Sequence, residues 1–138
     1  MKRCVVKLDD KKASSKIKRY QAISESAAKQ SNRSIIPEIK SVMSFKEAVS
    51  YAKGLDIAII PYELCEGMDS FKKVLSEIKS DKTVGIFIGP EGGFEASEVN
   101  FALENGITPV SLGRRILRTE TAGMTVMSII MYHLEIQE

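Results

Sequence analysis

The sequence is poor in the residues that build metal sites. It contains one histidine, His133, and two cysteines, Cys4 and Cys65, which lie far apart in the chain. Zinc and related sites need several Cys and His residues at short, characteristic spacings. We therefore expect no bound metal, and we expect both thiols to be free in a reducing cytoplasm.

Long hydrophobic runs are also missing. No apolar stretch approaches the roughly 20 residues that a membrane-spanning helix needs. The first residues, MKRCVVKLDDKK, lack the apolar core and small-residue cleavage site of a secretory signal. The 138 residues are enough for one domain with a hydrophobic core, and a hydrophobic content of 43% is ordinary for a globular protein. We expect a single cytoplasmic domain without a membrane partner.

Acidic residues are scarce in the first part of the chain. Residues 1–40 contain 11 Lys and Arg against 4 Asp and Glu, whereas residues 41–138 contain 9 against 14. Such asymmetry indicates a surface that meets a polyanion such as a nucleic acid. A solvated helix surface produces the same pattern, so charge alone leaves both interpretations open.

Helical and extended patterns alternate along the chain. Helical spacing of apolar residues predicts helices at residues 14–33, 44–54, 69–79, 96–106 and 121–134. Continuous apolar runs predict buried strands at residues 56–63, 83–88 and 107–112, and residues 34–39 form a shorter extended run. This alternation predicts an α/β fold with a mostly parallel sheet and helices on both of its faces.

The last predicted helix, TAGMTVMSIIMYHL, is apolar on more than one face. A helix that buries a single face should be polar on the other side. A subunit interface could cover the additional apolar surface, and complete burial within one subunit is the alternative.

Two glycine- and charge-rich segments follow predicted strands. The first, IFIGPEGGF, contains Glu91 among Gly89, Gly92 and Gly93, and the second, LGRRILRTETAG, contains three arginines. Ligands of parallel α/β sheets bind beyond the carboxyl ends of the strands. Neither segment has the G-x-G-x-x-G or Gly-Lys-Ser/Thr spacing of phosphate-binding loops. A central glutamate favours a ligand with positive charge or hydrogen-bond donors, although tight turns also collect Gly and Pro.

These segments carry a resemblance to a known family. The stretch IGPEGGF followed by LGRRILRTETA, with KRYQAISESAAKQSNRSIIPEI upstream, resembles the RsmE-type 16S ribosomal RNA uridine-N3 methyltransferases of the SPOUT class. The resemblance implies a domain, residues 1–138, that binds S-adenosylmethionine (SAM), has a C-terminal trefoil knot and forms a homodimer. Its implied partner is 16S ribosomal RNA or the small ribosomal subunit. It also implies a chain truncated at its N-terminus, without the family's RNA-binding, PUA-like domain.

The resemblance assigns roles to individual residues. Tyr62 and Glu63 belong to the first strand-end loop of the implied SAM pocket. The implied cofactor-binding residues are Ile60, Pro61, Gly89, Pro90, Glu91, Gly92, Gly93, Leu112, Gly113, Ile116, Leu117, Arg118, Thr121 and Ala122.

Catalysis and RNA binding are assigned in the same way. Arg118 would stabilise the deprotonated uracil, and Glu120 or Glu91 is the candidate base. The expected RNA-binding residues are Lys16, Lys18, Arg19, Arg33, Arg114 and Arg115. Two alternatives stay open, namely an inactive or partial RNA-binding module and a SPOUT methyltransferase that acts at another RNA site.

Overall fold

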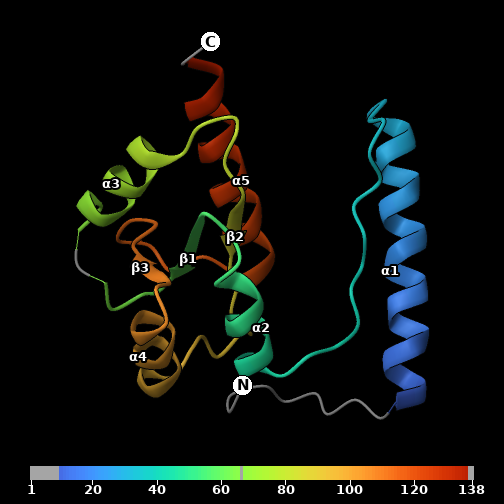
Figure 1. The fold of residues 1–138 in the computed structure, drawn as a ribbon, viewed down its shortest axis with the longest axis horizontal. Coiled ribbons are helices and arrows are strands. Elements are labelled where there is room, and N and C mark those ends of the chain that lie inside the picture. The colour runs from blue at the N-terminus through green and yellow to red at the C-terminus, as the bar shows by residue number, and fades with distance from the viewer. Residues whose placement is uncertain (1–9, 66, 137–138) are drawn as a thin grey trace. The chain divides into compact units, whose positions relative to one another are not determined.

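The computed structural model describes residues 10–65 and 67–136, which fall into two compact units (Figure 1). The first unit contains helix α1 (Asp10–Gln30) and continues to Ser44. The second unit begins at Phe45 and contains the sheet. Its elements are α2 (Phe45–Ala52), β1 (Ile57–Pro61), α3 (Asp69–Glu77), β2 (Val84–Ile86), α4 (Ala96–Glu104), β3 (Thr108–Val110) and α5 (Thr119–Ile136).

In the first unit, the segment that follows α1 runs back along the helix. The Ser24 hydroxyl donates to the Pro37 carbonyl at 2.7 Å, and the Ile39 N–H donates to Gln21 Oε1 at 2.8 Å. The extended run predicted at residues 34–39 therefore pairs with side chains of a helix. It forms no strand, and residues 36–44 carry neither helix nor strand.

The second unit contains a parallel sheet with the strand order β2-β1-β3. Ile57 pairs with Val84 on one side of β1, and Ile59 pairs with Thr108 on the other. The predicted α/β class with a parallel sheet is thus confirmed. Because all three strands run in the same direction, the loops that follow them leave from one edge of the sheet.

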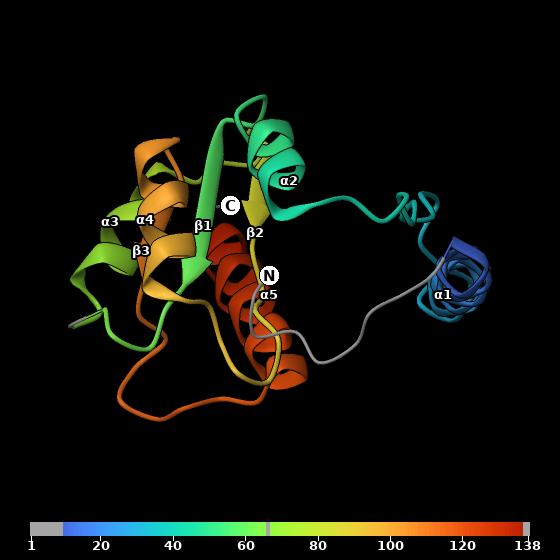
Figure 2. The ribbon, with the colours of Figure 1, turned by 90° about the horizontal axis from the view of Figure 1, so that it is seen from below.

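Helices cover both faces of this sheet, as predicted (Figure 2). Side chains alternate along a strand, so Ala58 and Ile60 of β1 point to one face and Ile59 to the other. Ala58 and Ile60 pack in a core cluster with residues of α2 and α4. Ile59 packs in a second cluster with residues of α3 and α5.

Helix α5 buries only one side. Val126 and Ile130 are buried in the second core cluster. By contrast, Met124, Met127 and Met131, at helical spacing, are 64%, 48% and 53% exposed. The sequence pattern therefore identified a real second apolar face, and this face remains exposed in the single chain.

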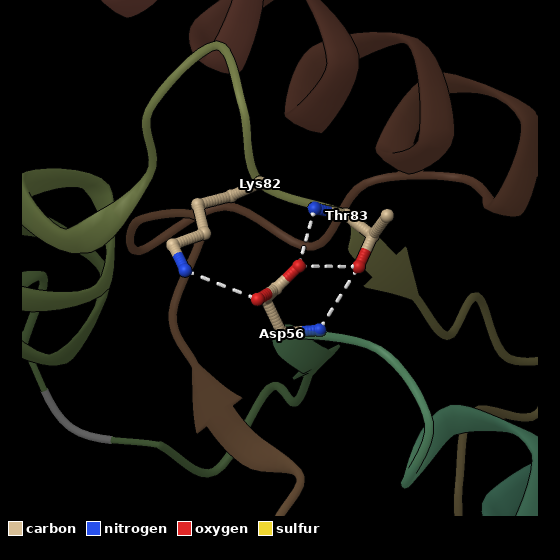
Figure 3. Close-up of polar contacts among 3 residues, drawn as sticks. All are labelled: Asp56, Lys82 and Thr83. Atoms are coloured by element: carbon tan, nitrogen blue, oxygen red, sulfur yellow. Dashed lines mark hydrogen bonds and ion pairs between the residues drawn. The ribbon is translucent and has the colours of Figure 1, made fainter.

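A polar network joins the residues that precede β1 and β2 (Figure 3). The Asp56 carboxylate accepts hydrogen bonds from the Thr83 N–H at 2.9 Å, the Thr83 hydroxyl at 2.7 Å and Lys82 Nζ at 3.1 Å. The Asp56 N–H in turn donates to Thr83 Oγ1 at 3.0 Å. The backbone and hydroxyl bonds of Thr83, with the Lys82 ammonium, hold the pKa of Asp56 well below its usual range.

This network predicts a pH-dependent contribution to stability. Because the pKa of Asp56 is lower in the folded state, its contribution is present above the unfolded pKa of about 3.9 and is lost as the pH falls towards the folded pKa. We expect Asp56→Asn to lower the melting temperature by a few degrees at pH 7, and the difference from the wild type should shrink below about pH 3. Thermal unfolding followed by circular dichroism would measure both effects.

A matched control is available in the exposed pair between Asp69 and Lys72, whose charged atoms lie 3.7 Å apart. Asp69→Asn should change the melting temperature much less, because exposed ion pairs contribute little. An equal melting temperature for Asp56→Asn and the wild type at pH 7 would contradict the role of the network.

Candidate functional site

Three loops at the carboxyl edge of the sheet enclose one cavity of about 560 Å³. We call them the first loop (residues 61–63), the glycine loop (residues 88–94) and the arginine loop (residues 111–118). The start of α5 completes the wall. The lining residues are Pro61, Tyr62, Glu63, Ile88, Gly89, Pro90, Glu91, Gly92, Gly93, Phe94, Ser111, Leu112, Gly113, Arg115, Ile116, Leu117, Arg118, Thr119, Glu120 and Ala122.

The glycine loop is a tight turn anchored in the core. The Gly93 N–H donates to the Pro90 carbonyl at 2.8 Å, and Gly93 has a φ of +68°, which favours glycine. A Cβ atom at Gly89 would lie 3.1 Å from two ring carbons of Phe94, which is buried in the first core cluster. The absence of side chains at these positions therefore lets the turn close beside the cavity.

Hydrogen bonds of two backbone groups hold the arginine loop, one to a side chain of the loop and one to helix α5. Gly113 has a φ of +106°, and its N–H donates to the hydroxyl of the buried Ser111 at 3.2 Å. The Arg118 carbonyl accepts from the Ala122 N–H at 2.8 Å, which ties Arg118 to the first turn of α5. The backbone from which the Arg118 side chain projects is thus fixed at the cavity wall.

Most of the implied cofactor-binding residues line this cavity, but two do not. Ile60 has a relative exposure of 0% and packs in the first core cluster, because it points to a face of the sheet that α2 and α4 cover. Thr121 lies in α5 and is not among the lining residues. Ile60 is therefore a core residue, and the neighbouring Pro61 reaches the cavity because it stands at the end of the strand.

Charged residues divide between the walls of the cavity. Glu63 and Glu91 come from the first loop and the glycine loop, whereas Arg115 and Arg118 come from the arginine loop. Glu120, the candidate base, lines the cavity from the first turn of α5. The cavity thus offers both signs of charge beside aliphatic and backbone groups.

The residues expected to bind RNA lie in both units, and all are exposed. Arg115 lines the cavity, while Arg114 beside it does not. The other four belong to the first unit: Lys16, Lys18 and Arg19 on α1, and Arg33 just after it.

Sequence reasoning missed several lining residues. Ile88, Phe94, Ser111 and Thr119 stand next to predicted positions, and all four line the cavity. Adjacency along the loops was the only signal that could have identified them, because their residue types are ordinary for core and turn positions.

The described residues provide neither a metal-ligand cluster nor a membrane-spanning helix. In residues 10–65 and 67–136, no three His, Cys, Asp or Glu side chains come together in a way that could hold a metal ion. None of the described helices is both long and apolar enough to cross a membrane. Cys65 is a free, half-buried thiol, and Cys4 lies outside the described residues.

The arrangement suits a ligand of nucleoside size with a charged end. Small-molecule sites are commonly about 300–1,000 Å³, mostly apolar, and carry a few placed polar groups. Here Ile88, Leu112 and Leu117 supply aliphatic surface, and the glycines expose backbone N–H and C=O groups. The charged residues stand around this interior.

Known proteins of similar sequence carry the name ribosomal RNA small subunit methyltransferase E. The chain is 36% identical over 137 residues to the ribosomal RNA small subunit methyltransferase E of Bacillus subtilis (strain 168), covering 97% of this chain and 54% of that protein. The corresponding protein of Mesomycoplasma hyopneumoniae (strain 232) is 33% identical over 82% of this chain and 47% of its own length. The chain therefore spans about half the length of these relatives.

Solved structures with a similar fold include a methyltransferase of the same name. A methyltransferase E from Neisseria gonorrhoeae, bound to S-adenosyl methionine, aligns with a TM-score of 0.79 at 29% identity, over 96% of this chain and 52% of that chain. A crystal structure described as that of a hypothetical protein aligns with a TM-score of 0.90 at 37% identity, over 99% of this chain and 54% of that chain.

The resemblance noted in the sequence is thereby confirmed. The model of the RNA methyltransferase domain family matches residues 1–131, which extend across both units of the structure. The chain belongs to the RNA methyltransferase domain family.

Proposed function

We propose that this chain is the catalytic part of a SAM-dependent methyltransferase that modifies N3 of a uridine in 16S ribosomal RNA. The observation that carries the proposal is the convergence of the three strand-end loops on one cavity. We further propose that residues 1–138 form a single methyltransferase domain with a C-terminal trefoil knot, and that it acts in the cytoplasm. Relatives named ribosomal RNA small subunit methyltransferase E support the choice of substrate.

The cavity fits SAM by its size and its donor set. Its volume of about 560 Å³ is within the range that small-molecule ligands use. Leu112 and Leu117 would pack against the adenine, and the backbone groups of the glycine loop would bind its polar atoms or those of the ribose. SAM, when bound, supplies a methyl group activated by a sulfonium.

The residues of the chain would prepare the nucleobase. N3 of uridine carries a proton and becomes a good nucleophile only when that proton is removed. The Arg118 guanidinium would stabilise the negative charge that then develops on the uracil carbonyl oxygens. Glu120, or Glu91 across the cavity, would accept the proton. The uridine must be unpaired or extruded to reach these groups.

The basic residues would bind the phosphates of the RNA. Lys16, Lys18, Arg19 and Arg33 form an exposed set in the first unit, and Arg114 is exposed in the arginine loop. Contacts of this kind give an affinity that falls as the salt concentration rises.

A homodimer is the second part of the proposal. The exposed face formed by Met124, Met127 and Met131 supports it, because contiguous apolar surface commonly marks an interface. We expect Met127→Glu to convert a dimer into a monomer in analytical ultracentrifugation, since it places a charge within the apolar face. Lys72→Glu, at an exposed position outside α5, is the control. A wild-type monomer at micromolar concentration would contradict this part.

Methyl incorporation tests the function directly. The purified chain would be incubated with SAM carrying a labelled methyl group and with small ribosomal subunits that lack the modification. Labelled 3-methyluridine, located by mass spectrometry of nuclease fragments, is the expected product. RNA binding without incorporation would identify a binding module, and a label at another nucleotide would identify a different substrate site.

A further inference from the structure

Glu63 is a carboxylate at the cavity wall that the proposed reaction does not use. Glu63 follows β1 in the first loop and is exposed at the cavity wall. A Cβ atom at Gly93 would lie 3.9 Å from Glu63 Oε1, so the carboxylate reaches across to the turn of the glycine loop. Two loops that meet only in the folded chain thus lie close together at this carboxylate.

Glu63 has no protein partner to neutralise it in the described part of the chain, where neither a hydrogen bond nor an ion pair involves its side chain. Some exposed carboxylates of this protein do have such a partner, as Glu38 does in Lys40, at 2.6 Å. The arginines of the cavity lie in a different loop, and neither Arg115 nor Arg118 pairs with Glu63 within the described residues. An acceptor at a cavity wall is thus available to a ligand.

The opposite signs of charge in the cavity indicate the chemistry of that ligand. Carboxylates come from the first loop, the glycine loop and the start of α5, and guanidinium groups come from the arginine loop. An amino-acid group carries an ammonium and a carboxylate separated by one carbon, so it can meet both signs at once. A neutral nucleoside could not satisfy either wall by ion pairing.

We infer that Glu63 binds the α-ammonium group of the ligand's amino-acid end and so fixes the orientation of that end in the cavity. The inference rests on the proposed function, since SAM carries such a group. Glu63 is a specificity residue in this view and takes no part in the transfer of the methyl group. Replacing Glu63 should lower the affinity for every ligand that carries the ammonium group and for no ligand that lacks it.

Calorimetric titration of the full chain with three ligands tests this assignment. SAM carries an ammonium and a sulfonium, S-adenosylhomocysteine carries the ammonium alone, and 5′-methylthioadenosine carries neither. We expect Glu63→Gln to weaken SAM and S-adenosylhomocysteine by about threefold to fivefold, as an exposed ion pair would. Binding of 5′-methylthioadenosine should stay within error of the wild type.

Glu104→Gln is the matched control, because it removes the same charge from an exposed position on α4 outside the cavity. It should leave all three affinities unchanged. Glu63 is exposed and unpaired in the described structure, so the variant should keep the circular dichroism spectrum and the melting temperature of the wild type.

Each other pattern overturns the inference in a distinct way. Equal weakening of all three ligands would assign Glu63 to the nucleoside or to loop structure. Weakening of SAM alone would assign it to the sulfonium, and unchanged SAM affinity would remove it from the binding site. If the wild type binds no SAM, the proposed function is wrong, and so is the inference that rests on it.

Discussion

Replacing Arg118 with alanine should reduce methyl transfer to RNA by about 100-fold or more, while SAM affinity falls much less. The loss of one preorganised donor that stabilises developing charge typically has this effect on the rate. Arg118 is held by the bond from the Ala122 N–H to its carbonyl, and its side chain lines the cavity. Single-turnover rates with labelled SAM and calorimetric affinities would measure the two quantities separately.

Two further variants separate the geometry of the Arg118 guanidinium from its charge, and the role of Arg118 from that of its neighbour. Arg118→Lys keeps the charge but loses the planar fork of the guanidinium, so partial activity is expected. Arg114→Ala removes a neighbouring arginine outside the cavity and should weaken RNA binding, with a shallower salt dependence, while saturating rates persist. Equal losses of SAM affinity and of rate in Arg118→Ala would show that Arg118 only binds the cofactor.

Replacing Gly113 with alanine should lower SAM affinity by about tenfold or more. At a φ of +106° an L-residue is strained, and the cost is typically about 1–3 kcal/mol unless the loop moves. A Cβ atom at Gly113 would meet nothing within 4 Å, so the effect would come from the backbone rather than from a collision. Movement of the arginine loop would displace the backbone groups on the cavity wall.

Gly106 provides a matched control for this variant. Gly106 also has a positive φ, +85°, and its Cβ would likewise meet nothing within 4 Å, but it does not line the cavity. Gly106→Ala should therefore lose stability in a similar way and keep its SAM affinity. If both variants bind SAM like the wild type, or both lose it equally, the arginine loop would have no specific part in the site.

Strand β1 was only partly predictable from its residues. The continuous apolar run predicted a buried strand, and the charged and glycine-rich segments that follow the strands predicted ligand loops. The sequence could not show, however, which of Ile60 and Pro61 lines the cavity. Ile60 packs into the core because it lies within the strand, whereas Pro61 lines the cavity because it stands at the end of the strand.

Helix α5 illustrates a related limit. Its composition predicted a second apolar face, since Met and Ile recur around the whole helix. The sequence left open whether the chain itself covers that face. Packing in the second unit buries Val126 and Ile130 and leaves the three methionines exposed.

The residue pattern by itself thus determined the fold class, the strand-end loops and the residue types available for chemistry, because these depend on local periodicity and turn geometry. Tertiary structure alone decided that Asp56 meets Thr83, 27 positions away, and that Glu63 reaches the turn at Gly93. It also decided which loop residues share one cavity. Parallel strands bring distant segments to a common edge, and their register, which no local pattern specifies, sets the side chains that meet there.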